Sequence, residues 1–219
     1  FVKGVPIIQL AAGDLSDKIS LVDDYFRHLI TILSSVQVGF TENSRKKSNS
    51  ILENLNLIPN GEYFPNPTLS DISINSNFIS QDGCYDLILV HPQSLSEKET
   101  QSDASKIEKM IDTSKRNIII RGNKDRNYKI LYELWENLSL KSNIEVYDNL
   151  EKSEFISILA GCDRFITNSS CAFYEAPMFL DPDQIIHIGK RNKNREIASY
   201  NKDDIKSSDS IVDFIVESL

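Results

Sequence analysis

The chain has 219 residues, of which 40% are hydrophobic and 26% charged, so it can bury the core of one large domain or two small ones. Its formal net charge of −8 at pH 7 argues against nucleic acids and membranes as partners, because both require a surplus of Lys and Arg on one face. The three cysteines have neither CxxC nor Cys/His spacing, so no disulfide framework and no metal site is expected. No apolar run is long enough to span a bilayer and no signal-peptide pattern is present, and we expect a cytoplasmic protein.

The opening of the chain does not resemble the start of a protein. Its first residue is Phe1 instead of methionine, and the segment Val2–Pro6 is typical of the middle of a protein. We therefore expect the sequence to be a large carboxy-terminal portion of a longer protein.

In the first third of the chain, short apolar runs alternate with longer helical patterns. The expected elements, in order, are a strand at Val5–Leu10, a helix near Leu21–Ser34, a strand at Val36–Phe40, a helix near Ser44–Asn54 and a strand at Tyr63–Pro67. This alternation predicts parallel strands joined by crossover helices. The stretch Asn66–Asp82 is rich in Asn, Ser, Pro and Asp without a clear period, and predicts a connection between two lobes.

The same alternation continues after the connection and predicts a doubly wound parallel sheet. The expected strands are Tyr85–Val90, Asn117–Arg121, Ile144–Tyr147, Arg164–Thr167 and Gln184–Ile188. The expected helices include Lys106–Ile111, Tyr128–Leu138, Ser153–Ala160 and Cys171–Met178, with a packed closing helix at Ser210–Leu219. The expected domains are a first lobe over residues 1–75, a second lobe over 76–206 and the closing helix over 207–219. Ligands of such sheets bind beyond the carboxyl ends of the strands, so residues just after each strand are candidates for the site.

The segment after the Arg164–Thr167 strand is the most informative of these strand ends. Asn168, Ser169 and Ser170 stand between the strand and the predicted helix, where backbone N–H groups and hydroxyls favour a phosphate. Glu175 is expected one turn into that helix, where a carboxylate is suited to accept both hydroxyls of a ribose. The alternatives are a serine N-cap and a solvated or capping glutamate, which are common structural roles.

Further strand ends carry polar side chains at the same predicted edge. His91 directly follows a strand, which strengthens the case for a phosphate-binding or acid role against that of a packed core histidine. Asp14 and Asn123 follow two other strands, and Lys190-Arg191 form a basic loop after the last one. In an acidic protein this basic island is suited to an anion, although runs of charge are usually solvated.

In the first lobe, Asp23 and Asp24 stand one helical turn from Arg27 and His28. They form either two cleft carboxylates beside a cation or an ordinary exposed helix with ion pairs. Taken by themselves, the residues indicate a two-lobed binder of a nucleotide-like anion.

Several of these segments together resemble the UDP-N-acetylglucosamine 2-epimerase family, and in particular its hydrolysing branch, which releases free N-acetylmannosamine. In family order they are Leu10–Asp14, Asp23–His28, Asn66-Pro67, Val90–Pro92, Asn123–Asp125, Asn168–Cys171, Glu175–Pro177, Gly189–Arg191 and Arg195-Glu196. The resemblance implies an α/β fold, GT-B-like, of two Rossmann-like doubly wound lobes, with the first lobe incomplete and a UDP-sugar bound between the lobes.

The resemblance also implies roles for single residues. The implied catalytic residues are Asp14, Asp23, Asp24 and His91, and one of Asp23 and Asp24 is expected to match the family's second acidic residue in the cleft, with Arg27 beside it. The implied substrate-binding residues are Arg27, Asn123, Ser169, Ser170, Glu175 and Arg191. Among them, the histidine and the two serines are expected to hold the diphosphate, the glutamate the ribose hydroxyls, and Arg191 to lie near the phosphates.

The implied function is that of an enzyme converting UDP-N-acetylglucosamine and water to UDP and N-acetylmannosamine, in amino-sugar or sialic-acid-type metabolism. Family chemistry begins with removal of the proton at C2 of the sugar, and UDP then leaves from C1. No cofactor or metal is implied, and, since family members are commonly oligomeric, a homo-oligomer is expected.

Some positions depart from the family pattern. Ala11 replaces a family acid and cannot move a proton, so Asp14 is the candidate substitute. The opening strands of the first lobe, with another catalytic acid, are missing, and Asn127 stands where the family turn has glycine. The alternatives are therefore a UDP-sugar-binding protein without epimerase activity, or a GT-B glycosyltransferase that acts on a separate acceptor.

Overall fold

The computed structural model describes residues 4–14, 22–67, 84–192, 195 and 208–219. The chain divides into two compact units, Phe1–Ser76 with Asn194–Leu219, and Asn77–Lys193. The first division lies beside the expected boundary at 75/76, whereas the second precedes the expected boundary at 206/207. Arg195 pairs with Asp14, so it groups with the first unit. Most of the expected connection, Asn66–Asp82, lies outside the described residues.

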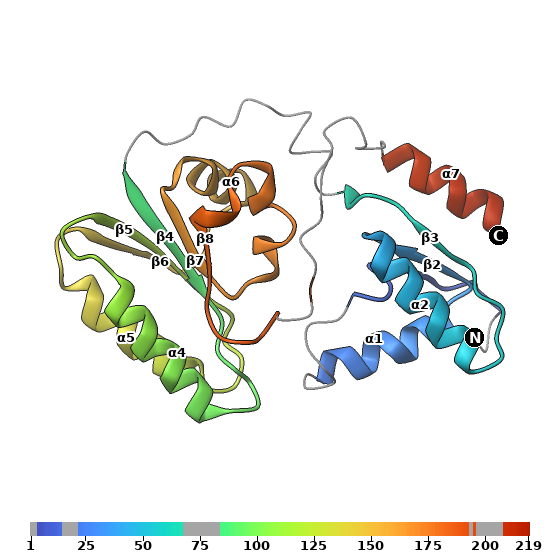
Figure 1. Cartoon of the computed structure of the whole chain (residues 1–219), viewed down its shortest axis with the longest axis horizontal. Helices are drawn as coiled ribbons and strands as arrows, with labels where there is room; N and C mark the ends of the chain where they lie inside the picture. The colour runs from blue at the N-terminus through green and yellow to red at the C-terminus, as the bar shows by residue number, and fades with distance from the viewer. Residues whose placement is uncertain (1–3, 15–21, 68–83, 193–194, 196–207) are drawn as a thin grey trace. The chain divides into compact units, whose positions relative to one another are not determined.

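The first unit contains a parallel sheet in the order β1-β2-β3 (Figure 1). Its strands are β1 (Ile8–Leu10), β2 (Val36–Gly39) and β3 (Gly61–Tyr63). Its helices are α1 (Val22–Leu33), α2 (Glu42–Asn54) and α7 (Ser208–Ser218). β3 ends where the expected strand Tyr63–Pro67 begins, because Pro65 and Pro67 have no N–H to donate to a strand ladder.

β2 shows how this sheet is packed. Val36 and Val38 are fully buried and form an apolar cluster with Ile211 of α7. Gln37 points to the opposite face, since successive side chains alternate along a strand. Its amide donates to the carbonyl oxygen of Ser34, just beyond α1, at 2.8 Å. The two faces of β2 therefore pack against different helical segments.

The second unit is a parallel sheet in the order β6-β5-β4-β7-β8. Its strands are β4 (Tyr85–Val90), β5 (Arg116–Arg121), β6 (Ile144–Tyr147), β7 (Arg164–Thr167) and β8 (Ile185–His187). Its α-helices are α4 (Glu97–Met110), α5 (Tyr128–Ser139) and α6 (Lys152–Gly161). In Figure 1, α4 and α5 cover one face of this sheet and α6 lies on the other. This is the doubly wound architecture that the sequence predicted.

The core of the second unit lies between the sheet and the α4–α5 layer. Ile107 of α4 and Trp135 of α5 are fully buried in one apolar cluster with Ile88 of β4 and Ile119 of β5. The strand order reverses between β4 and β7, because β5 and β6 follow on one side of β4 while β7 and β8 lie on its other side. Such a switch point is where doubly wound sheets bind ligands. Within the described ranges, no helix is both long and apolar enough to cross a membrane.

The segment after β7 differs from the sequence-based prediction. In place of an α-helix at Cys171–Met178 there are two 3₁₀ helices, η1 (Ser170–Ala172) and η2 (Ala176–Met178), with η3 (Pro182–Gln184) before β8. Pro177 explains the interruption, because proline lacks an N–H and disfavours helical backbone at the preceding residue. Glu175 therefore lies directly before η2 and not one turn into an α-helix.

Candidate active site

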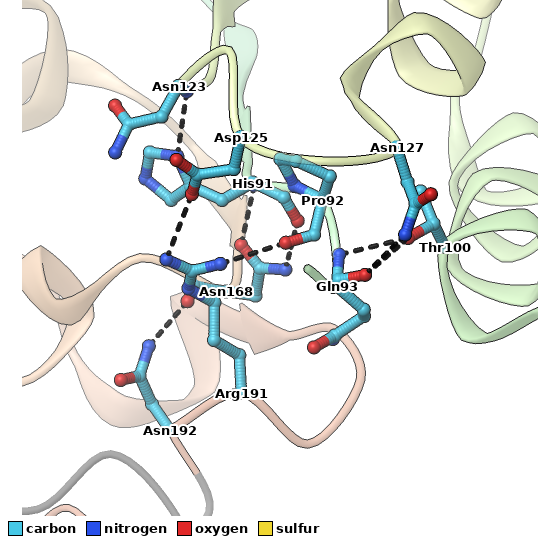
Figure 2. A network of polar contacts seen from close by, with 10 residues as sticks. All are labelled: His91, Pro92, Gln93, Thr100, Asn123, Asp125, Asn127, Asn168, Arg191 and Asn192. Atoms are coloured by element: carbon cyan, nitrogen blue, oxygen red, sulfur yellow. Dashed lines mark hydrogen bonds and ion pairs between the residues drawn. The ribbon is translucent and has the colours of Figure 1, made fainter. Parts of the chain in front are cut away.

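His91 and Asn168 join the ends of β4 and β7 at the switch point (Figure 2). The His91 backbone N–H donates to Asn168 Oδ1 at 2.7 Å, and Asn168 Nδ2 donates to the His91 carbonyl oxygen at 2.8 Å. Asn168 is buried, so both bonds lie where the local dielectric is low. The Asn168 side chain thus fixes the backbone of His91 at the carboxyl edge of the sheet.

The His91 ring is held from the turn between β5 and α5. The backbone N–H of Asn123 donates to His91 Nδ1 at 3.1 Å. The pKa of His91 is lowered to about 4, first by burial and then by the charge of Arg191, with Asp125 acting in the opposite direction. At neutral pH the ring is therefore uncharged, so it can donate a hydrogen bond but supplies no positive charge.

Arg191 supplies a cation at this site. Its Nη1 donates to the Pro92 carbonyl oxygen at 2.8 Å, and its Nη2 lies 3.5 Å from Asp125 Oδ2. A guanidinium has five N–H donors, so these two contacts leave others for an anion. The next residue, Asn192, donates from Nδ2 to the Asn168 carbonyl oxygen. The loop after β8 is therefore anchored to the switch point (Figure 2).

The two serines that follow Asn168 form a turn with its own hydrogen bonds. The Ser169 N–H donates to Thr167 Oγ1 at 2.9 Å, and the Cys171 N–H donates to Ser169 Oγ at 3.5 Å. These N–H groups are used within the turn, and η1 is too short to act as the expected α-helix N-terminus. Ser170 is partly exposed, whereas Ser169 is buried.

Glu175 is a partly buried carboxyl group just beyond that turn. Burial raises its pKa, while a backbone hydrogen bond and the charge of Lys152 act in the opposite direction. A carboxylate that has lost part of its hydration gains from new donors, such as the hydroxyls of a sugar.

In the first unit, Asp14 binds two arginines. Arg195 Nη1 donates to Asp14 Oδ2 at 2.7 Å, and its side chain is only 6% exposed. Arg27 Nη1 lies 3.6 Å from the same oxygen and donates to the Asp14 carbonyl oxygen at 2.9 Å. The Asp14 carboxylate thus holds two cations, and its role in proton transfer stays a prediction.

Helix α1 carries two carboxyl groups near its start, those of Asp23 and Asp24. Asp24 is completely buried. Asp23 is the second residue of α1, and its side chain lies outside the described part of the chain.

The turn after β1 has an unusual backbone. Ala11 has φ of +58° and Gly13 has φ of +72°, both in the left-handed region. A Cβ at Gly13 would lie 1.9 Å from the Ser44 carbonyl oxygen, so only glycine fits there. The alanine that replaces a family acid therefore sits in a strained conformation.

The structure groups the predicted site residues by unit. In the second unit His91, Asn123, Arg191 and the Ser169-Ser170 turn lie around the switch point, and in the first unit Arg27 contacts Asp14. Sequence reasoning missed the bridging role of Asn168 and the pairing of Arg195 with Asp14. Two features of the sequence could have indicated these contacts. Asn168 is a polar residue directly after a strand, and Arg195 is a second arginine beyond the basic loop.

Comparison with known proteins identifies the family of this chain. The family model for UDP-N-acetylglucosamine 2-epimerase matches residues 1–202. The chain belongs to this family. It is 28% identical over 206 residues to the GDP/UDP-N,N'-diacetylbacillosamine 2-epimerase (hydrolyzing) of Campylobacter jejuni. That match covers 87% of this chain and 52% of the other, so the chain spans about half the length of the curated relative it matches.

Solved structures of 2-epimerases share the fold of this chain. The UDP-GlcNAc 2-epimerase of Methanocaldococcus jannaschii, in complex with UDP-GlcNAc and UDP, has a TM-score of 0.70 at 16% identity, covering 99% of this chain and 70% of that one. The S. aureus MnaA–UDP structure has a TM-score of 0.67 at 18% identity, covering 98% and 60%. The likeness confirms the predicted GT-B-like fold with Rossmann-like lobes.

Proposed function

We propose that this chain is part of a hydrolysing UDP-N-acetylglucosamine 2-epimerase, which converts UDP-N-acetylglucosamine and water to UDP and N-acetylmannosamine. Membership of the family and similarity to a hydrolysing relative support this reaction class. The observation that carries the proposal on this chain is the grouping of His91, Asn123 and Arg191 at the switch point of the second unit. This is where a doubly wound sheet binds a nucleotide.

The second unit is suited to the departure of UDP from C1 of the sugar. Bond cleavage there builds negative charge on the diphosphate. Arg191 offers a fixed positive charge, held by the Pro92 carbonyl oxygen, and neutral His91 offers a hydrogen bond. Donors positioned before the reaction typically lower such a barrier by about 3 kcal/mol each. We therefore assign both residues to the leaving diphosphate, and the Ser170 hydroxyl beside them.

Removal of the C2 proton requires a base, which we place on α1. Asp14 is bound to two guanidinium groups and Asp24 is completely buried, so Asp23 is the favoured candidate. Glu175 takes the ribose hydroxyls in this proposal.

The test uses the full-length protein and two sugar nucleotides, UDP-N-acetylglucosamine and UDP-N,N'-diacetylbacillosamine, since the relative's name contains the latter. NMR detection of free N-acetylmannosamine beside UDP is the expected result with the first. If product is released only from UDP-N,N'-diacetylbacillosamine, that sugar nucleotide is the substrate in place of UDP-N-acetylglucosamine. Asp23→Asn is expected to abolish turnover while UDP still binds. No product from either sugar would overturn the epimerase proposal.

One observation favours a second function. Ala11 offers no acid at the turn after β1, and Asp14 is engaged by Arg27 and Arg195. A UDP-sugar-binding protein without turnover fits these facts. Calorimetric binding of UDP by the full-length protein, together with no product by NMR, would establish it.

We also place the proposed enzyme in the cytoplasm and in amino-sugar or sialic-acid-type metabolism. Free N-acetylmannosamine, the proposed product, is a precursor for sugars of that type. Detection of labelled sialic-acid-type sugars in cells that express the full-length protein, and their loss with Asp23→Asn, tests this placement.

A further inference from the structure

The contact between Asn123 and His91 determines where the imidazole proton resides. A backbone amide nitrogen can donate a hydrogen bond but has no lone pair with which to accept one. Since the Asn123 N–H points at His91 Nδ1 at 3.1 Å, Nδ1 must be the unprotonated nitrogen. A neutral imidazole carries its single proton on the other nitrogen, which is Nε2.

The residue before Asn123 makes this contact possible. A Cβ at Gly122 would lie 2.4 Å from the Val90 carbonyl oxygen and 2.9 Å from His91 Nδ1. Any side chain at position 122 would therefore push the ring away from the peptide that binds it. The Gly122 carbonyl oxygen also accepts a hydrogen bond from the Tyr132 hydroxyl at 3.3 Å, which holds the same peptide from α5.

The backbone of His91 is restrained as well. Its N–H and carbonyl oxygen are both bound by the Asn168 side chain, which fixes the backbone from which the ring extends, and turning the ring would break its hydrogen bond with the Asn123 N–H. The charged groups that act on the ring, among the described residues, are Arg191 and Asp125. These two are paired with each other, and Arg191 opposes a second positive charge on the imidazole.

We infer that the Gly122–Asn123 peptide is a tautomer lock, which keeps the proton of the uncharged His91 ring on Nε2. In this state His91 is a fixed hydrogen-bond donor to an anionic oxygen, such as a phosphoryl oxygen, and does not exchange protons with the ligand. Gly122 and Asn123 are positioning residues that act through His91. The tautomer is a property of the protein alone, whereas its consequence for turnover rests on the proposed function.

The direct test is nitrogen NMR of the full-length protein labelled with ¹⁵N-histidine, recorded without ligand. This chain has three histidines, and comparison with His91→Gln assigns the signals of His91. The expected result is a neutral ring with its proton on Nε2 and signals that do not change between about pH 5.5 and 8, below and above the ordinary pKa of 6.5. A proton on Nδ1, or a titration within this range, would overturn the inference.

Two substitutions at the lock sharpen the test. Gly122→Ala is expected to release the ring from the Asn123 N–H, so that both neutral tautomers become populated, whereas Asn123→Ala keeps its backbone N–H and should leave the tautomer unchanged. The nitrogen signals of the wild-type ring decide the question if Gly122→Ala does not fold. An unchanged tautomer in a folded Gly122→Ala protein would show that the glycine is not needed for the lock.

The turnover rates of two His91 variants provide a second test. The side-chain nitrogen of glutamine can take the place of Nε2 as a donor, while that of asparagine lies nearer to the position of Nδ1. If His91 acts only as a donor from Nε2, His91→Gln retains at least tenfold more kcat than His91→Asn. Equal loss in both variants, beside a locked Nε2 tautomer, would overturn the donor role and leave the tautomer standing. Absence of turnover in the wild-type protein would count against the proposed function alone.

Discussion

The side chain of Asn168 forms two hydrogen bonds with the backbone of His91, so the contact between β4 and β7 continues beyond their last ladder pair, Leu89 with Thr167. An Asn is suited to this position because its side chain carries a donor and an acceptor that match those of a peptide group.

Asn168→Asp tests this pairing with almost no change in shape. The variant keeps the acceptor and loses the donor, so the His91 carbonyl oxygen faces a carboxylate oxygen. We expect the free energy of unfolding to fall by about 1–3 kcal/mol in urea titrations at pH 7. Asn123→Asp is the control, since that side chain is exposed and its backbone N–H is unaffected, and a change within about 0.5 kcal/mol is expected. Equal stability of the two variants would show that the pairing contributes little.

Arg191→Met should weaken the binding of UDP by roughly tenfold or more, because it removes a charge-assisted donor at the anion site. Lys190→Met removes the same charge from the adjacent exposed position and should have a much smaller effect. Calorimetric titration of both variants with UDP measures the difference. Equal losses of affinity would assign the effect to net charge and not to the anchored guanidinium.

Glu175→Gln is expected to stabilise the fold at neutral pH while it weakens the binding of UDP. Burial raises the pKa of Glu175 in the folded state, so ionisation favours the unfolded chain above that pKa. The resulting penalty is full at neutral pH and disappears as pH falls below the pKa of the unfolded chain. The advantage of the glutamine variant in thermal melts should therefore shrink toward pH 4. A variant less stable than the wild type at pH 7 would contradict this sign.

Ala11→Gly should raise the free energy of unfolding by about 1 kcal/mol, because glycine adopts the left-handed backbone of this turn without strain. Ala12→Gly is the matched control. Ala12 is fully buried and is not among the residues with positive φ, so its replacement should be destabilising. Denaturant titrations of both variants give the comparison, and destabilisation by Ala11→Gly would indicate that the methyl group packs favourably.

Much of the second unit is predictable from its sequence, because its strands are short apolar runs with polar residues directly after them. His91 and Asn168 stand out in this way, and the order of the runs predicts the doubly wound sheet. The prediction of an α-helix at Cys171–Met178 was wrong because Pro177 interrupts the helix. The spacing of apolar residues alone does not reveal this effect of a proline. Asn127, which replaces a family glycine, keeps the left-handed backbone with φ of +73°, since Asn tolerates that region better than other residues.

The pairing of Arg195 with Asp14 was beyond prediction for a different reason. The two residues are 181 positions apart in the sequence, and each is an ordinary surface residue by type. Their burial together depends on tertiary structure, and no local spacing reports it.

The bonds that build the site span long stretches of sequence, with His91 and Asn168 separated by 77 positions and Pro92 and Arg191 by 99. Such contacts form only after the loops between them have closed, and closure of long loops carries an entropic cost that local contacts do not. An anion site assembled from these bonds should therefore be among the last features to form when the lobe folds. Recovery of UDP binding during refolding would then lag behind recovery of helical structure.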